Sequence, residues 1–306
     1  MNIFYDLKDV PKALQAGVLA IGNFDGVHKG HQEVIKRLCE VKLGRPAGVL
    51  TFSPHPEEFL NPQKNLFRLS SDAQKAEQLL ALGADFVILH QLSQEFLALS
   101  AQEFINFILR DKLQCQELVV GDDFRFGAHA LGNIGDLTQA SRDNFFKLHV
   151  VGAKAHKDER FSSSAIRKYL SVGDLTSAYN LLGRNFSLRG TVSTGQGVAH
   201  KLGYPTANII PPANFSLARG VYVSSTRICG RDYPSATNVG IRPSVSNNPV
   251  LMIETHILGH KLDLVGQELE IFFIKHIRDE IKFESLEALK SQITKDISYI
   301  SSNYFV

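Results

Sequence analysis

Residues 17–31 read GVLAIGNFDGVHKGH, and this stretch decides the fold of the first half of the chain. Gly17–Ile21 is a short apolar run of the kind that forms a buried strand. Gly22 and Gly26 permit a tight turn at the carboxyl end of that strand, and helical character begins near His28. A strand that passes through a glycine turn into a helix predicts an α/β unit. The amino end of such a helix attracts anions such as phosphate.

The alternation of strand and helix continues through the first half of the chain. The further strand candidates are Ala47–Phe52, Phe86–Leu89, Glu117–Gly121 and Phe146–Val151. Helices are predicted over His31–Val41, over Asp72–Leu82 and from Ser100, where Glu103 is placed for a capping box. This order predicts a Rossmann-like α/β domain, with a parallel sheet and helices on both faces. In such sheets, ligands bind beyond the carboxyl ends of the strands.

The second half of the chain changes to short β-type runs between turn signals. Two helical stretches come first, Ser163–Leu170 and Leu175–Leu182, separated by Gly173. The β-type runs that follow are SLRGTVST (187–194), GVYVSSTRI (220–228), SATNVGI (235–241), LMIETHIL (251–258) and ELEIFFIKHI (268–277). This rhythm predicts a small antiparallel β-barrel or sandwich, followed by a terminal helix from near Ser285. We place the boundary near residues 183–186, which gives domains 1–184 and 185–306.

The bulk composition narrows the classes of protein to consider. The chain has 306 residues, of which 44% are hydrophobic and 21% charged, and its formal net charge is +2. These values are ordinary for a two-domain globular protein and do not indicate a nucleic-acid binder. The three cysteines are far apart, so neither a disulfide framework nor a zinc site is expected. The chain shows no signal peptide and no apolar stretch of about 18 residues. We therefore expect a cytoplasmic protein with no nucleic-acid and no membrane partner.

Two histidines follow the first glycine turn. His28 and His31 are three residues apart, so they share one face of a helix. Gly30 between them has no side chain, which we expect to let a flat or bulky ligand lie against the backbone. The set predicts a nucleotide cradle with two imidazole donors, without the Lys-Ser/Thr of a P-loop or the spacing of a dinucleotide fingerprint. The alternative is a surface helix with two incidental histidines.

The string GNFDGVHKGH resembles the HxGH element of the nucleotidylyltransferase superfamily. Its longer form looks like that of the bacterial bifunctional riboflavin kinase/FAD synthetase family. Three more segments resemble that family in order: TFSPHP (51–56) its TFxPHP, GDDFRFG (121–127) its GxDFRFG, and SSSAIR (162–167) its SSTxIR. Each segment falls where a predicted strand ends or a helix begins. The alternatives for single segments are an N-cap at Ser162–Ser164 and core aromatics at Phe124 and Phe126.

The resemblance implies that the first domain is an FMN adenylyltransferase, which joins FMN to ATP to form FAD and releases pyrophosphate. The implied catalytic residues of this domain are His28, His31 and Arg167. The implied ATP-binding residues are Gly22, Asn23, Phe24, Asp25, Gly30, Ser163 and Ser164. The implied FMN-binding residues are Pro54, His55, Asp123, Phe124 and Arg125. Magnesium is the expected counter-ion of the phosphates.

The second domain carries the run LGYPTANI at residues 202–209. Thr206 and Asn208 are two apart, so on a strand their side chains point to the same face, and their oxygens suit magnesium. The alternative is a Pro-Thr turn with a capping Asn. The run resembles the PTAN motif of riboflavin kinases. Gly220–Tyr222, Asn238–Ser244, Glu254–Leu258, Arg278–Phe283 and the last helix also match that domain in order.

The resemblance implies that the second domain phosphorylates riboflavin to FMN. Glu254, within an otherwise apolar run, is the implied general base for the ribityl hydroxyl. Thr206 and Asn208 are the implied magnesium ligands. The implied ATP- and riboflavin-binding residues are Gly195, His200, Lys201, Gly203, Pro205, Asn238 and Arg278. We expect ATP and flavins (riboflavin, FMN, FAD) as the small-molecule partners, and a monomer or transient homo-oligomer.

The chain departs from the family pattern at several positions, most of them in the second domain. The departures are Ala199, His200, Ser244, Gly259 and Val265, with Ser164 and Ala165 in the first domain. Two other interpretations therefore stay open. One is a monofunctional FMN adenylyltransferase whose second domain only binds flavin or stabilises the first. The other is a flavin-responsive regulator or nucleic-acid-binding protein, against which the near-neutral charge argues.

Overall fold

The computed structural model describes residues 2–152, 155–156, 159–194, 202–242, 250–260 and 262–304. The chain divides into two compact units between Ser163 and Ser164. Helices α7 (Ser163–Ser171) and α8 (Leu175–Leu182) precede the β-rich part of the second unit. The domain bounds 1–184 and 185–306 stay a prediction about where each activity resides.

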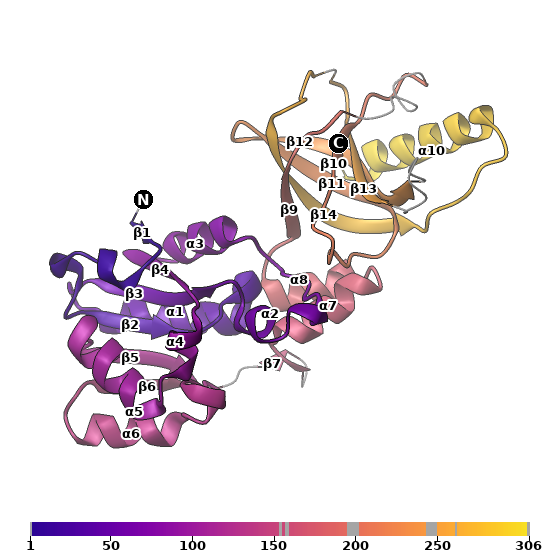
Figure 1. Ribbon diagram of the computed structural model, residues 1–306. Coiled ribbons are helices and arrows are strands. Elements are labelled where there is room, and N and C mark those ends of the chain that lie inside the picture. The colour runs from indigo at the N-terminus through magenta and orange to yellow at the C-terminus, as the bar shows by residue number, and fades with distance from the viewer. Residues whose placement is uncertain are drawn as a thin grey trace. The chain divides into compact units, whose positions relative to one another are not determined.

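A six-stranded sheet forms the centre of the first unit (Figure 1). Its strands are β1 (Ile3–Phe4), β2 (Val18–Ile21), β3 (Ala47–Ser53), β4 (Phe86–Gln91), β5 (Glu117–Gly121) and β6 (Lys147–Val151). They lie in the order β1-β4-β3-β2-β5-β6, and every neighbouring pair is parallel. This confirms the predicted Rossmann-like domain. The strand order reverses between β2 and β5, and ligands bind at such a point in this class of sheet.

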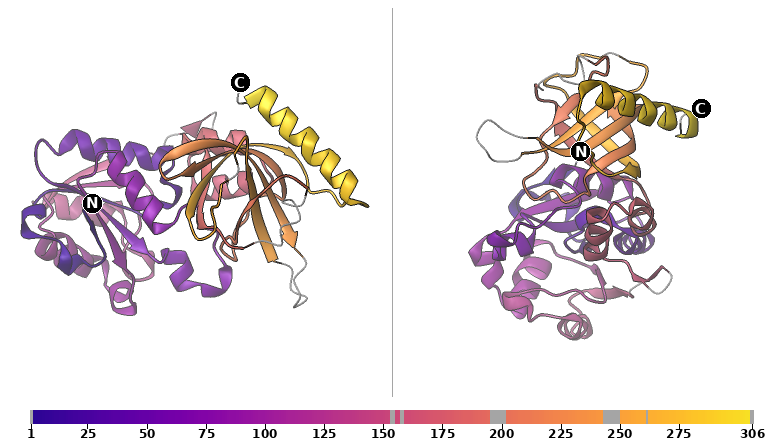
Figure 2. Two further views of the ribbon diagram at one scale, coloured as in Figure 1. Left: turned by 90° about the horizontal axis from the view of Figure 1, so that it is seen from above. Right: turned by 90° about the vertical axis from the view of Figure 1, so that its right-hand side faces the viewer.

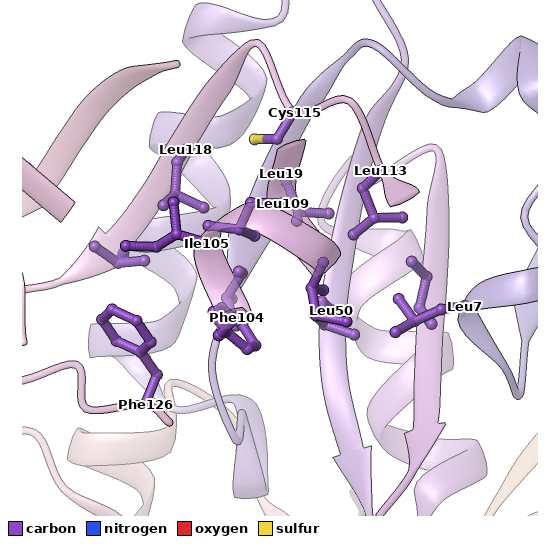
Figure 3. Close-up of a cluster of buried hydrophobic side chains, with 14 of the residues drawn as sticks. Leu7, Leu19, Leu50, Phe104, Ile105, Leu109, Leu113, Cys115, Leu118 and Phe126 are labelled. Carbon is purple, nitrogen blue, oxygen red and sulfur yellow. The ribbon is translucent and has the colours of Figure 1, made fainter. Parts of the chain in front are cut away.

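Helices cover both faces of this sheet, as the sequence predicts. Alternate side chains of β2 pack on opposite faces of the sheet, because successive side chains of a strand point in opposite directions. Val18 and Ala20 pack with α1 (Lys29–Val41) and α3 (Asp72–Ala81). Leu19 and Ile21 pack with η5 (Phe104–Lys112) and α6 (Ile134–Arg142). Figure 3 shows Phe104, Ile105 and Leu109 from η5 lying over Leu19, Leu50 and Leu118 of the strands.

The predicted capping box at Ser100 is present in full. Ser100 Oγ accepts the backbone N–H of Glu103, whose carboxylate accepts the backbone N–H of Ser100 at 2.8 Å. The helix that begins there, α5 (Ala101–Glu103), continues as η5, which has π-helical hydrogen bonding.

The remaining elements described in this unit are α2 (Pro56–Leu60), α4 (Gln94–Ala98), η1 (Leu7–Asp9), η2 (Lys12–Leu14), η3 (Asp25–Val27), η4 (Pro62–Lys64), η6 (Ala128–Ala130), β7 (Ala155–His156) and β8 (Glu159–Arg160).

The second unit contains an antiparallel sheet in the order β10-β13-β12-β11-β14-β9. The strands are β9 (Phe186–Thr191), β10 (Ala207–Ile209), β11 (Gly220–Ile228), β12 (Arg231–Arg242), β13 (Val250–Ile257) and β14 (Glu268–Arg278). A bridge between Ser193 and Asn208 brings the two edges together, with Ser193 N donating to Asn208 O at 2.8 Å. The sheet therefore curls into the predicted barrel, and α10 (Leu286–Tyr304) lies alongside it (Figure 2).

Five hydroxyl groups meet inside this barrel. The set is Ser224, Thr226, Ser235, Thr237 and Thr255, all with 0% exposure. Ser224 Oγ lies 2.7 Å from Thr237 Oγ1 and 2.8 Å from Ser235 Oγ. Thr226 and Thr255 close the ring, so each hydroxyl has hydrogen-bond partners among the others.

Among the described residues, no helix is both long and apolar enough to span a membrane.

Candidate active sites

The glycine turn after β2 has a strained and well-bonded backbone. Phe24 and Val27 adopt left-handed φ values of 50° and 39°, a region that costs energy for residues other than glycine. The buried carboxylate of Asp25 accepts the backbone N–H of Leu69 at 3.0 Å, and Gly26 N donates to Ser70 Oγ. The side chains of Phe24 and Asp25 are thus turned inward, so what they present to a ligand is their backbone.

His28 and His31 form a stacked pair at the start of α1. Their ring centroids are 3.6 Å apart with planes inclined by 16°. His28 is the N-cap of the helix, and its Nδ1 accepts the backbone N–H of His31 at 3.3 Å. The proton of the neutral His28 ring is therefore on Nε2, which makes Nε2 the donor. The predicted pair of imidazoles at a helix amino end is present.

The space beside Gly30 is occupied by protein. A Cβ at this position would lie 3.1 Å from His28 Cε1 and 3.3 Å from Phe161 Cβ. A side chain at this position would therefore crowd its neighbours, and the binding of a ligand against the Gly30 backbone stays a prediction. Gly30 instead allows the His28 ring and the Phe161 side chain to approach the helix backbone.

The Ser-rich segment at the start of α7 reaches the glycine turn. Ser163 Oγ donates to the carbonyl oxygen of Asp25 at 2.9 Å. Ser164 is exposed at the start of α7, and Arg167 lies one helical turn beyond Ser163 on the same helix. The fold thus joins two segments that are far apart in sequence.

The TFSPHP segment flanks the turn on the β3 side. Thr51 is fully buried, and its Oγ1 donates to the carbonyl oxygen of Asn23 at 3.0 Å. Pro54 and His55 follow the strand end, and His55 is the N-cap of α2, with Nδ1 accepting the N–H of Glu57. These residues stay candidates for the FMN site.

The GDDFRFG segment flanks the turn on the β5 side. Asp123 and Arg125 are exposed, Phe124 is half-buried, and the rings of Phe124 and Phe126 stack with centroids 5.6 Å apart. Phe126 is a core residue, 6% exposed, so the alternative of a core aromatic holds for it.

Sequence reasoning missed Arg160 in β8. Its Nη2 lies 2.9 Å from Asp122 Oδ1 and 3.0 Å from Asp123 Oδ2. This ion pair adds a guanidinium to the GDDFRFG segment. Asp122 and Asp123 are adjacent in the sequence, but Arg160 is 38 residues from Asp122, so the sequence gives no sign of this ion pair.

A register row of polar residues crosses three strands of the barrel. Asn208 of β10 lies opposite Glu254 of β13, which in turn lies opposite Asn238 of β12. Directly opposed residues point to the same face of a sheet. The neighbours of Glu254 on its strand, Ile253 and Thr255, have 0% exposure and face the interior, so the row lies on the outer face of the sheet, where Asn208 is 5% exposed. A carboxylate between two amides is an arrangement that can bind and orient a hydroxyl.

The residues before β10 are held close to this row. Asn208 Nδ2 donates to the carbonyl oxygen of Thr206 at 3.1 Å. His256 Nδ1 lies 2.7 Å from the carbonyl oxygen of Pro205, and the Tyr204 ring meets the His256 ring edge-on. Sequence reasoning did not give His256 a role, although it stands two residues after Glu254.

Arg278 is engaged by the terminal helix. Its guanidinium contacts Asp296 of α10 at 2.7 and 3.0 Å. The side chain is 18% exposed, so the pair fixes α10 to the end of β14. The binding of ATP or riboflavin by Arg278 stays a prediction.

Gly203 precedes β10 with a left-handed φ of 95°. The predicted site residues Gly195, His200 and Lys201 lie outside the described residues, as do Ala199 and Ser244.

In the second unit, the predicted magnesium ligands Thr206 and Asn208 would bind through oxygen atoms. The described residues contain no group of three or more His, Cys, Asp or Glu that could hold a metal ion. Magnesium keeps several waters and phosphate oxygens and needs few protein ligands. The Thr206 hydroxyl and the Asn208 amide oxygen, beside Glu254, fit that requirement.

These features define a two-domain transferase, with an α/β nucleotide-binding unit followed by a β-barrel unit with a carboxylate in its polar row. The FAD synthetase family model matches residues 10–165, and the riboflavin kinase family model matches residues 182–304. The chain belongs to the bifunctional riboflavin kinase/FMN adenylyltransferase family.

Individual relatives agree with this assignment. A bifunctional riboflavin kinase/FMN adenylyltransferase of Pseudomonas fluorescens is 38% identical over 283 residues, which cover 92% of this chain and 91% of the relative. The enzyme of the same name from Buchnera aphidicola (subsp. Schizaphis graminum) is 36% identical over 312 residues, covering 100% and 99%. A solved structure from Streptococcus pneumoniae, described as a macrolide-efflux protein, is 27% identical with a TM-score of 0.87, covering 99% and 98%.

Proposed function

We propose that this protein makes FAD from riboflavin in two ATP-dependent steps, with phosphorylation in the β-barrel unit and adenylylation in the α/β unit. The observation that carries the proposal is the match of each unit to its own family model. The match over residues 182–304 favours two activities over an adenylyltransferase whose second domain only binds flavin.

The adenylylation step needs alignment and charge stabilisation more than a base. The phosphate of FMN is already anionic, so its oxygen attacks the α-phosphorus of ATP directly. A new P–O bond forms, the bond to the β-phosphate breaks, and pyrophosphate leaves. His28 and His31 donate to the phosphates as charge develops, and Ser163, Ser164 and Arg167 hold the leaving β- and γ-phosphates. Each of the two imidazole donors is worth roughly a hundredfold or more in rate.

The phosphorylation step needs a base, because a ribityl hydroxyl is neutral. Glu254 takes the hydroxyl proton while the hydroxyl oxygen attacks the γ-phosphorus of ATP, and ADP leaves. The amides of Asn208 and Asn238, in register with Glu254, support this role by orienting the groups around the carboxylate. Thr206 and Asn208 would hold magnesium, which neutralises phosphate charge when bound.

One incubation tests the whole proposal. The pure protein is mixed with riboflavin, ATP and magnesium, and riboflavin, FMN and FAD are separated by chromatography. FMN should appear first and FAD later. FMN without FAD would contradict the adenylyltransferase, and FAD from supplied FMN but none from riboflavin would contradict the kinase. A cytoplasmic location and a monomeric or transiently homo-oligomeric state stay predictions from the sequence.

A further inference from the structure

A lysine is buried at the sheet edge where the candidate adenylylation site lies. Lys75 is 5% exposed, and lysine is almost never fully buried unless it is paired. It lies near the start of α3, and its Nζ donates to the carbonyl oxygen of Phe52 at 3.0 Å. Phe52 stands at the carboxyl end of β3, two residues before Pro54. The mechanism described above does not use this ammonium group.

Asp72 links the lysine to the same segment. Its Oδ1 lies 3.5 Å from Lys75 Nζ, and its Oδ2 accepts a hydrogen bond from Ser53 Oγ. Arg68 contacts Asp72 and also donates from Nε to Glu58 in α2 at 2.7 Å. The start of α3 is thereby bonded to both ends of residues 52–58, which carry Pro54 and His55.

The chain just before α3 is also bonded to the glycine turn. Leu69 N donates to the buried carboxylate of Asp25 at 3.0 Å, Gly26 N donates to Ser70 Oγ at 3.3 Å, and α3 itself packs against η3. A buried carboxylate at this turn would repel the triphosphate of ATP. The buried ammonium group of Lys75, on the helix that packs against this turn, offsets that charge, because charges inside a protein are weakly screened.

We propose that Lys75 is a positioning residue for adenylyl transfer. It holds the turn that carries His28 and His31 in register with the β3 end that carries Pro54 and His55. The inference rests on the proposed function, in which the turn binds ATP and the β3 end contributes to the FMN site. Transfer requires the two substrates to be aligned, and a misplacement of about 1 Å can cost ~100-fold in rate.

The test compares Lys75→Met and Lys75→Arg in the full chain. Methionine has a similar length and removes both the charge and the donor, whereas arginine keeps the charge. For Lys75→Met we expect kcat for FAD formation from FMN to fall roughly tenfold to a hundredfold. The KM values for ATP and FMN should each stay within about threefold, because alignment is lost more than binding. Kinase turnover in the same sample should not change, and Lys75→Arg should restore part of the rate.

Lys42, whose side chain is 31% exposed, offers a control with similar contacts in the same unit. Its Nζ also contacts a carboxylate and a carbonyl, Asp85 at 2.9 Å and Gly83 O at 3.3 Å. Asp85 precedes β4 and accepts the N–H of Ala47, so this cluster lies at the amino ends of the strands, opposite to Lys75. Lys42→Met should leave the kcat for FAD formation within about twofold.

The pH dependence separates positioning from stability. Burial lowers the pKa of Lys75, Arg68 lowers it further, and the carboxylates of Asp72 and Asp25 oppose the shift. Adenylylation should therefore fall as pH rises through this lowered pKa, and Lys75→Arg should move that loss to higher pH, because arginine stays protonated. The stability contribution has the opposite sign. The unfolded chain binds more protons in this range, so stability rises with pH.

The outcomes separate the proposed function from the role of Lys75. A wild-type protein that makes no FAD from FMN would overturn the proposed function and this inference together. A wild-type rate in folded Lys75→Met would overturn the inference and leave the function intact. If Lys75→Met does not fold, Lys75→Arg decides: a pH profile identical to that of the wild type overturns the inference, and a shifted profile supports it.

Discussion

Ser163 donates a hydrogen bond to the carbonyl oxygen of Asp25 at 2.9 Å, although 138 residues separate them. The bond joins the first residue of α7 to the turn that precedes α1. Phe161 also lies close to Gly30 near the start of α1. Two contacts therefore hold residues 161–163 against the glycine turn and the start of α1. Both helix amino ends carry N–H groups without intrahelical partners and the positive end of a dipole. In the proposed mechanism, the amino end of α1 binds the polyphosphate of ATP.

Removing the Ser163 hydroxyl should weaken adenylylation moderately. A neutral hydrogen bond contributes about 0.5–1.5 kcal/mol, so Ser163→Ala should lower kcat/KM for FAD formation from FMN roughly two- to tenfold. Ser171 at the other end of α7 also donates to a carbonyl, that of Lys168 at 2.8 Å, and Ser171→Ala is the control. Equal losses in the two variants would show that the effect belongs to the helix and not to its contact with Asp25.

Removing the His31 imidazole should abolish FAD formation. The ring stacks on His28 at the amino end of α1 and, in the proposed mechanism, donates to phosphate as charge develops. Loss of one such donor costs roughly a hundredfold to a thousandfold. His31→Ala should therefore make FMN from riboflavin at the normal rate and almost no FAD, as measured by chromatography. Normal FAD synthesis by this variant would contradict the assignment of the pair.

Local patterns made much of the first unit predictable. The buried strands, the capping box at Ser100 and the helix start near His28 depend on residues within a few positions of one another. Family resemblance supplied the candidate roles. Contacts between distant segments were not predictable, because nothing near Ser163 or Arg160 in the sequence points to Asp25 or Asp122. In the sequence, Lys75 is indistinguishable from an exposed helix lysine, and only the fold shows that it is buried.

Alternation alone does not predict that the hydroxyls inside the barrel are buried. A period of two normally assigns serine and threonine to the outer face of a barrel. Here Ser224 and Thr226 face inward, because Ser235, Thr237 and Thr255 on neighbouring strands supply hydrogen-bond partners. The sequence shows the hydroxyls but not the strand register that pairs them.

Breaking this ring should destabilise the second unit. Thr237→Val keeps the shape of the side chain and removes the hydroxyl that Ser224 and Thr255 contact at 2.7 Å. Buried groups left without a partner cost about 1–3 kcal/mol of unfolding free energy. Hydrogen exchange of the amides of β11 to β13 measures this, and Thr191→Val on exposed surface should change it by less than about 0.5 kcal/mol. Equal protection in the two variants would mean that the ring adds no stability.

The kinase prediction depends on the register row of Asn208, Glu254 and Asn238. Glu254→Gln keeps the size of the side chain and its place between the two amides, but removes the proton acceptor. A general base contributes roughly a hundredfold or more, so FMN formation from riboflavin should fall by at least that factor. Adenylylation of supplied FMN should be unchanged, and Glu268→Gln, at a side chain that is 64% exposed, should affect neither step. Unchanged riboflavin phosphorylation in Glu254→Gln would place the base elsewhere and leave the row a structural feature of the barrel.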